Sequence, residues 1–184
     1  RPLDYLVSTE TKLTNITGLM IEAVPDLSFN GGPGLSKDGN IVITELQARW
    51  KGKGEGVEET GISFADAKAT FTQKDFDVKR TFDGNLDGKN RGWALHGTNH
   101  KIPHRAVYKF KETMTGDGNQ GVTLTVGVLC RLKSHPIGRF RIYVTQDADP
   151  LQFGIPAHVA EALGVESGQR SAQQGKALVA WVGE

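Results

Sequence analysis

The residues with the clearest chemical spacing form a short acidic loop, Asp83–Gly88, with the sequence Asp-Gly-Asn-Leu-Asp-Gly. Oxygen-bearing side chains at its first, third and fifth positions, followed by glycine, are typical of a tight loop that wraps Ca²⁺. The candidate metal ligands are Asp83, Asn85 and Asp87. The twelfth position is Ala94 instead of a bidentate Glu, which excludes an EF-hand. The alternative is a plain hairpin turn at Asp83-Gly84, because short acidic loops often bind nothing.

Calcium takes about six to eight oxygen ligands, so three loop side chains are insufficient. Backbone carbonyls and one distant carboxylate would complete the shell, and Glu45 is the candidate for that carboxylate. It follows Ile41 and Ile43 at the two-residue period of one strand face. A carboxylate on an apolar face needs a cation or a buried donor, which supports placing Glu45 beside the acidic loop.

Trp93 lies in the glycine-rich sequence that follows the acidic loop. An indole in a loop of a β-sandwich can stack on a sugar ring while polar neighbours bind its hydroxyls. The expected ligand-binding set is therefore Trp93 with His96, His104 and Arg105. The alternative is a core tryptophan that anchors the loop, because buried aromatic side chains dominate protein cores.

Three histidines, His96, His100 and His104, recur at four-residue spacing. On a helix this spacing would align metal ligands, but Gly97 and Pro103 make a helix implausible. A loop could still fold the histidines around zinc, although no supporting outer-shell pattern is visible. Solvated or locally hydrogen-bonded histidines are the favoured interpretation.

Nucleophilic and cofactor chemistry find no support in the sequence. It contains no Gly-x-Ser-x-Gly elbow, no Cys-x-x-Cys-His haem site and no phosphate-binding glycine loop. The one cysteine, Cys130, alternates with apolar residues on one strand face, where a thiol is usually inert. A polysaccharide hydrolase with two distant carboxylates stays open, with Glu22, Glu45 and Asp66 as available groups.

The elements that must position these residues read as β-strands. The 23 glycines cluster with Asn, Asp and Pro between short apolar runs, which indicates an all-β domain. The clearest strand is 122–132, with alternating apolar residues. Further strands are expected at Tyr5–Ser8, Gly18–Val24, Ile41–Trp50, Lys68–Thr72, Arg105–Phe110 and Phe140–Val144. The spacing predicts a jelly-roll β-sandwich over 1–150. A short helical extension is expected over 151–184, with Ser171 capping its second helix.

Composition narrows the class of partner. The formal net charge is +1, so no strong field attracts the chain to nucleic acid. No apolar run approaches the roughly 20 residues of a membrane-spanning helix. The chain opens at Arg1 without an initiator Met, which favours a processed protein or an excised piece of a longer one.

Three groups of segments together resemble a known module. The first includes Thr17–Asp26 and Asp38–Leu46, the second Ala69–Gln73, Gly92–Ala94 and Pro103–Val107, and the third His135–Thr145. This combination resembles a β-sandwich module of large planctomycete-type proteins that carry c-type cytochrome domains, over about residues 13–145. The module is also similar to galactose-binding, discoidin-like jelly rolls. In those, a strand that ends in Glu pairs with an Asp-Gly loop around structural calcium, which implies Glu45 and Asp83-Gly84 here. The Glu-bearing strand comes earlier in this chain than in those domains.

The sequence thus leads to one functional expectation and two alternatives. We expect a non-catalytic, extracytoplasmic carbohydrate-binding module, stabilised by calcium, whose partners are a polysaccharide or glycan and the neighbouring domains of a parent chain. The first alternative is a structural docking or spacer domain that binds no free ligand. The second is a hydrolase that acts on polysaccharide.

Overall fold

A computed structural model describes residues 2–87, 91–116, 118–152, 159 and 162–182. The chain divides into two units, Arg1–Leu151 and Gln152–Glu184, and each is described by itself.

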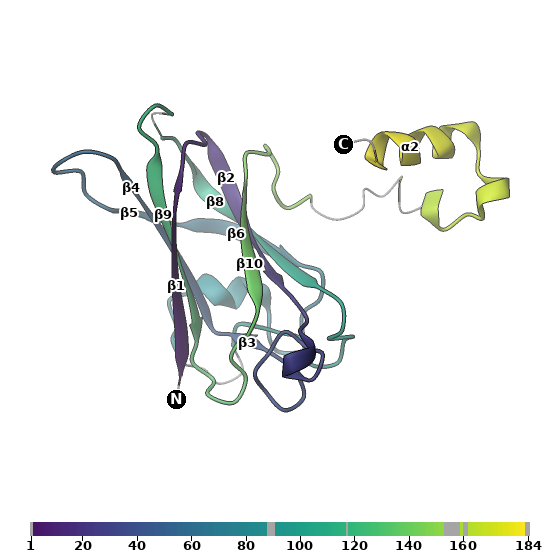
Figure 1. Ribbon diagram of the computed structural model, residues 1–184, viewed down its shortest axis with the longest axis horizontal. Helices are drawn as coiled ribbons and strands as arrows, with labels where there is room; N and C mark the ends of the chain where they lie inside the picture. Colours follow the sequence, from purple (N-terminus) through teal and green to yellow (C-terminus); the bar gives the residue numbers. More distant parts are fainter. Residues whose placement is uncertain (1, 88–90, 117, 153–158, 160–161, 183–184) are drawn as a thin grey trace. The chain divides into compact units, whose positions relative to one another are not determined.

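The described residues of the first unit form two four-stranded antiparallel sheets and one two-stranded antiparallel ladder (Figure 1). Sheet A has the order β1-β9-β4-β5 and sheet B the order β10-β2-β8-β6. Sheet A comprises β1 (Leu3–Thr11), β9 (Val122–Cys130), β4 (Glu45–Gly52) and β5 (Thr60–Ile62). Sheet B comprises β10 (Phe140–Thr145), β2 (Ile16–Ala23), β8 (His104–Met114) and β6 (Phe64–Ala69). The structure is all-β in this unit, as the glycine-punctuated sequence predicted.

One apolar core lies between the two sheets, because strand alternation directs every second side chain inward. In β9, the five residues at the even positions 122–130 belong to this core. In β2 the inward set is Leu19, Ile21 and Ala23, which leaves Met20 and Glu22 on the outer face. Tyr108 of β8 is fully buried, and its hydroxyl accepts a 3.0 Å hydrogen bond from the Thr81 hydroxyl.

The strand expected over Ile41–Trp50 is divided in two. The two-residue strand β3 (Val42–Ile43) pairs with β7 (Trp93–Ala94), whereas β4 begins at Glu45 and pairs with β9. Thr44 lies between them and ties the break to sheet A: its N–H donates to the carbonyl oxygen of Leu129 at 2.8 Å. The chain therefore changes partners at the point where Glu45 begins β4.

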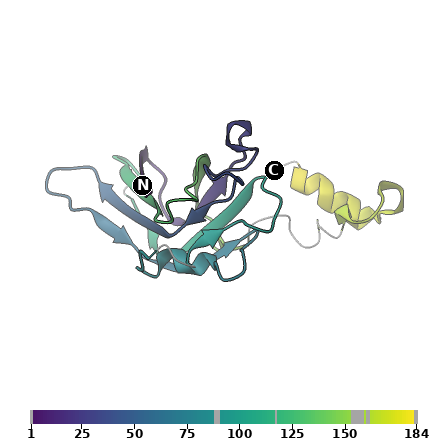
Figure 2. The same ribbon diagram turned by 90° about the horizontal axis from the view of Figure 1, so that it is seen from below.

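Two short strands and two 3₁₀ helices lie in the connections between the long strands. The stretch 51–61 ends in β5, and the β4–β5 hairpin extends beyond the sheets (Figures 1 and 2). The long connection 82–103 contains β7 and follows the 3₁₀ helix η2 (Val78–Phe82). A second 3₁₀ helix, η1 (Leu27–Phe29), is capped by the Asp26 carboxylate, which accepts from the N–H of Ser28.

The C-terminal unit contains η3 (Ser167–Gln169) and helix α2 (Ala172–Val182). Ser171 caps α2 as expected: its Oγ accepts from the N–H of Gln174, and the Gln174 side chain accepts from the N–H of Ser171. Most of the helix expected to begin at Pro156 lies outside the described residues. Within the described part of the chain, no helix combines the length and the apolar character needed to cross a membrane.

The close approach of Gly92 to β3 fixes where β7 lies. Gly92 has a φ of 87°, and a Cβ at this position would overlap the carbonyl oxygen of Ile43. A glycine is required both by the positive φ and by the lack of space.

We expect Gly92→Ala to lower the free energy of unfolding by about 3 kcal/mol or more, because backbone overlap adds to the cost of a positive φ. The matched control is Gly56→Ala, where φ is 75° but nothing lies within 4 Å of the added Cβ. This control carries the backbone cost alone, about 1–2 kcal/mol. Urea unfolding of both variants measures the difference, and equal losses would contradict the tight β3–β7 approach.

Candidate functional site

Polar side chains gather at both ends of the short β3–β7 ladder. Because the two strands are antiparallel, the residues before β3 lie beside those after β7, and the reverse holds at the other end. Asp38 and His96 flank one end of the ladder, and Glu45 and Arg91 flank the other. Most residues singled out from the sequence therefore lie near one of these two ends.

Glu45 is buried and only partly satisfied. Its side chain reaches the acidic loop, where Oε1 accepts a 3.2 Å hydrogen bond from the N–H of Gly84. Its Oε2 is buried and has no hydrogen-bond partner among the described residues. Burial raises the pKa of Glu45 to about 7, and the nearby Asp83 carboxylate acts in the same direction. The expected proximity of Glu45 to the Asp83-Gly84 turn is therefore present in the structure.

The Asp83 carboxylate and the Asn85 amide turn back on the backbone of the loop. Asp83 Oδ1 accepts from the N–H of Asn85, and Asn85 Oδ1 accepts from the N–H of Asp87, each at 2.9 Å. The other Asp83 oxygen, Oδ2, pairs with the Arg91 guanidinium at 2.8 Å. Arg91 thus supplies the positive charge next to Asp83.

These contacts bear on the fit of a calcium ion. Among the described residues, no three His, Cys, Asp or Glu side chains are grouped so that they could share a metal ion. Among the buried side-chain oxygens of the described residues, only Glu45 Oε2 lacks a hydrogen-bond partner, and either a proton or a cation would satisfy it. Asp83 Oδ1 and Asn85 Oδ1 accept from backbone N–H groups, and Asp83 Oδ2 pairs with Arg91. The calcium site stays a prediction.

Two of the expected ligand-binding residues are interior. Trp93 is fully buried, and its indole N–H donates a 2.8 Å hydrogen bond to the carbonyl oxygen of Phe71. His104 is 4% exposed, and its Nε2 lies 2.9 Å from the carbonyl oxygen of Asn99. This corrects the expectation of a rim around Trp93: β7 pairs with β3 and carries the indole into the core, where it has no face for a sugar.

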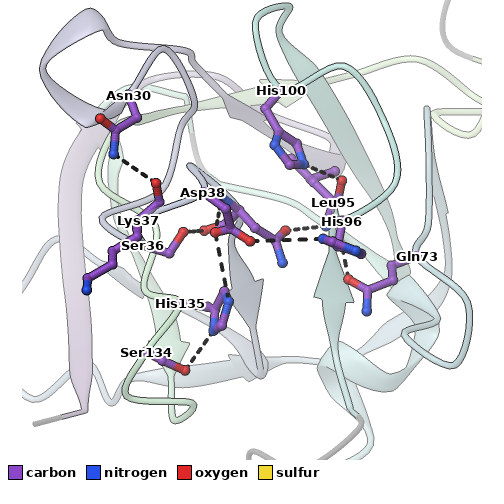
Figure 3. Close-up of polar contacts among 11 residues, drawn as sticks. Asn30, Ser36, Lys37, Asp38, Gln73, Leu95, His96, His100, Ser134 and His135 are labelled. Atoms are coloured by element: carbon purple, nitrogen blue, oxygen red, sulfur yellow. Dashed lines mark hydrogen bonds and ion pairs between the residues drawn. The ribbon is translucent and has the colours of Figure 1, made fainter.

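His96 is exposed and lies at a different place, beside Asp38 (Figure 3). The Asp38 carboxylate sits between two imidazoles, with His96 Nδ1 at 3.9 Å and His135 Nε2 at 4.0 Å. Burial raises the pKa of Asp38, but hydrogen bonds from Ser36 and from the N–H of Asn40 outweigh it and lower the pKa. Three loops thus meet at one carboxylate.

His100 and His104 each contact a backbone carbonyl oxygen, of Leu95 and Asn99 respectively. Together with His96 at Asp38, the three histidines face three different partners. The favoured interpretation of locally hydrogen-bonded histidines is confirmed for His100 and His104.

Arg105 projects from the outer face of sheet B toward Glu22. Its Nε lies 2.9 Å from Glu22 Oε1, while Arg141 and Tyr143 contact the other oxygen, Oε2. Burial raises the pKa of Glu22, but the hydrogen bonds from Arg105, Tyr143 and Arg141 outweigh it, and the pKa is lowered. The side chain of Arg105 therefore lies apart from those of Trp93, His96 and His104, although Arg105 follows His104 in β8.

A groove that the sequence did not reveal runs along the side of the sandwich where sheet A meets sheet B. One part has a volume of about 260 Å³ and lies between Trp50 of β4, the strand β5 and the end of β8. Its polar lining includes Thr60, Ser63, Lys111 and Glu112. Trp50 is half-buried and packs against the core.

A second part of the groove continues toward Glu45. It has a volume of about 470 Å³, shares Ile62, Ser63 and Lys111 with the first part, and is also lined by Gln47 and Phe82. The groove exists because Ser63 links β5 of sheet A to β6 of sheet B, and the N–H of Lys111 donates to its carbonyl oxygen. The one sequence signal was the alternation of Trp50 with Leu46 and Ala48 on the inward face of β4.

Comparison with protein-family models, curated proteins and solved structures finds no match to this sequence.

The buried carboxyl of Glu45 leads to a pH-dependent prediction. Because its pKa is raised, the folded protein holds a proton there that the unfolded chain loses near pH 4.5. This contribution to stability is complete below that pH and is lost as the pH rises through about 7. Glu45→Gln mimics the protonated form, so we expect the variant to gain on the order of 1 kcal/mol over the parent between pH 5 and pH 8.

The measurement is chemical denaturation at both pH values, with calcium chelated. Glu112→Gln is the control, because it makes the same chemical replacement at an exposed carboxyl. Groups common to both proteins cancel in the difference. Parallel stability–pH curves for parent and Glu45→Gln would contradict a neutral, buried Glu45.

The same pair of proteins tests the calcium prediction. A calcium ion held by the Glu45 carboxylate raises the Tm of the parent at pH 8 in millimolar calcium and leaves Glu45→Gln unchanged. An identical Tm of the parent with and without calcium would contradict the predicted calcium site.

Proposed function

We propose that this protein is a non-catalytic carbohydrate-binding module that holds a glycan in the groove between Trp50 and the end of β8. The assignment of its sandwich to the galactose-binding jelly-roll type, and an extracytoplasmic location where polysaccharides are found, belong to the same proposal. The module binds by shape and hydrogen bonding, with no covalent step.

The observation that supports this function is the state of Trp50. It is a half-buried tryptophan at the wall of a hollow, so one part of the ring is anchored in the core and another part is accessible. Sugar rings have apolar faces that pack on indole, and a rigidly held ring loses little conformational freedom on binding. Its indole N–H is a donor that can bind a sugar hydroxyl.

The polar lining of the groove fits a hydroxyl-rich ligand. Thr60 and Ser63 offer hydroxyl groups, and Lys111 and Glu112 add one donor and one acceptor of opposite charge. The two charges balance, so this part of the groove selects no strongly charged group. Its volume of about 260 Å³ is just below the roughly 300–1,000 Å³ of typical ligand pockets, so it suits a small unit of a longer glycan.

We expect Trp50→Ala to weaken glycan binding at least about tenfold, because removal of an aromatic anchor from an interface typically costs 2 kcal/mol or more. Glycan-array screening of the parent identifies a ligand, and calorimetry with that ligand measures the loss. Trp50→Phe keeps a ring against the core and is expected to retain part of the affinity.

Thermal melting of both Trp50 variants verifies that they are folded. Leu6→Ala, at an exposed residue of β1 outside the groove, is the control and is expected to bind like the parent. Full affinity of a folded Trp50→Ala variant would overturn the proposed site.

A second candidate function, docking to a neighbouring domain of a parent chain, is favoured by one observation. An apolar groove of about 380 Å³ opens between β1 and β10, which are the edge strands of the two sheets. Its lining is Val7, Thr9, Leu124, Val126, Phe140, Ile142 and Val144. Edge strands beside an apolar groove can accept another chain. If the folded parent binds no glycan on a broad array, the docking function is favoured.

A further inference from the structure

The outer face of sheet B carries a second polar centre, which shares no residue with the Trp50 groove. Glu22 lies in the middle of this face, on β2. The strand register places Arg141 of β10 directly opposite it on one side and Arg105 of β8 directly opposite it on the other. Residues opposite each other across strands lie close enough to pair, so one carboxylate meets two guanidinium groups.

The geometry of this cluster is well defined. Arg105 Nε lies 2.9 Å from Glu22 Oε1, and Arg141 Nη1 lies 3.2 Å from Oε2. The Tyr143 hydroxyl donates a 3.1 Å hydrogen bond to the same Oε2. The Glu22 side chain is only 5% exposed, whereas those of Arg105 and Arg141 are 47% and 58% exposed. The carboxylate is covered, and the two cations that cover it face solvent.

Charge is not balanced within the cluster: two guanidinium groups share one carboxylate, which leaves an excess of one positive charge. Other pairs on or beside this face are matched one to one, Arg139 with Asp26 and Lys79 with Asp66. The excess at Glu22 is therefore a local property of this cluster, although the whole chain has a formal charge of only +1.

The guanidinium donors point to the kind of ligand. Arg105 contacts Glu22 through Nε, so its guanidinium carries two further Nη groups that can donate to a ligand. Guanidinium groups bind carboxylates and sulfates through paired N–H donors. Because Glu22 already fixes both side chains, a ligand has less conformational freedom to remove when it binds. Tyr143 is 41% exposed and adds an aromatic surface beside the two cations.

We propose that Arg105, Arg141 and Tyr143, held by Glu22, bind the carboxylate or sulfate groups of an acidic polysaccharide. Glu22 is a positioning residue in this site, since it contacts the two arginines instead of the ligand. The site goes beyond the proposed glycan groove, which is neutral, and gives the protein a second contact for a charged chain.

The test is affinity electrophoresis of the folded, full chain in gels that contain polygalacturonate, dextran sulfate or neutral dextran. The uronate and sulfate polymers separate the two anion sources, and dextran tests neutral sugar. We expect at least one acidic polymer to retard the parent, with Kd rising steeply as NaCl increases. The double variant Arg105→Gln/Arg141→Gln is expected to bind at least about tenfold more weakly.

The matched control is Arg49→Gln/Arg131→Gln, which removes two partly exposed, ion-paired arginines, one in β4 and one just after β9 of sheet A, and gives the same net charge. It is expected to bind like the parent. Because the first double variant leaves Glu22 without cations, Arg105→Lys/Arg141→Lys is the second variant: it keeps the charge and removes the paired donors, and weaker binding is expected again.

Three results would overturn the proposal: equal loss in the sheet A control, no retardation by either acidic polymer, or binding of phosphatidylserine vesicles without binding of the polymers. None of these results tests the proposed glycan groove. That groove is tested separately by Trp50→Ala, which leaves both arginines intact. Conversely, if the protein binds acidic polymers through Arg105 and Arg141 but binds no neutral glycan, only the proposed glycan site in the Trp50 groove is contradicted.

Discussion

Buried carboxylates are costly unless hydrogen bonds or opposite charges compensate them, and this protein compensates two of them in different ways. Glu22 receives two guanidinium groups and a tyrosine hydroxyl, so its pKa is lowered and it stays charged. Glu45 receives a single backbone N–H and lies near Asp83, so its pKa is raised to about 7. One site is thus a fixed anion that organises cations, and the other is a carboxyl whose charge changes near neutral pH.

The contrast between Trp50 and Trp93 follows from strand pairing. Trp93 belongs to β7, which pairs with β3. Its indole N–H donates to the carbonyl oxygen of Phe71. Trp50 lies where β4 pairs with the short β5, at a point where the chain then crosses to the other sheet. Trp50 and Ser63, the residue of the crossing, line one hollow, whereas Trp93 is fully buried in the core. Exposure of an aromatic side chain here depends on connections between sheets, which local sequence does not encode.

The elements that could be predicted from the sequence are those that depend on short-range pattern. The alternation in 122–132 predicted β9, and Ser171 predicted the start of α2. The proximity of Glu45 to Asp83-Gly84 was anticipated because a carboxylate beside apolar residues needs a partner. The break at Thr44 was not anticipated, because Ile41–Trp50 has a continuous strand-like pattern, and the change of partner from β7 to β9 is a tertiary event. The Glu22 cluster was missed for a related reason: only the register of three strands brings residues 22, 105 and 141 together.

The different chemistry of the two proposed sites has a consequence for how a polysaccharide is held. The Trp50 groove offers an indole and balanced charges, so its contribution comes mainly from apolar contact and hydrogen bonds and changes little with salt. The Glu22 face offers excess positive charge at half-exposed guanidinium groups, so its contribution falls as salt rises. If both sites engage one polymer, the second contact is effectively intramolecular, and the combined affinity exceeds that of either site. Two modest sites of different chemistry would then select long chains that carry both neutral and acidic sugars.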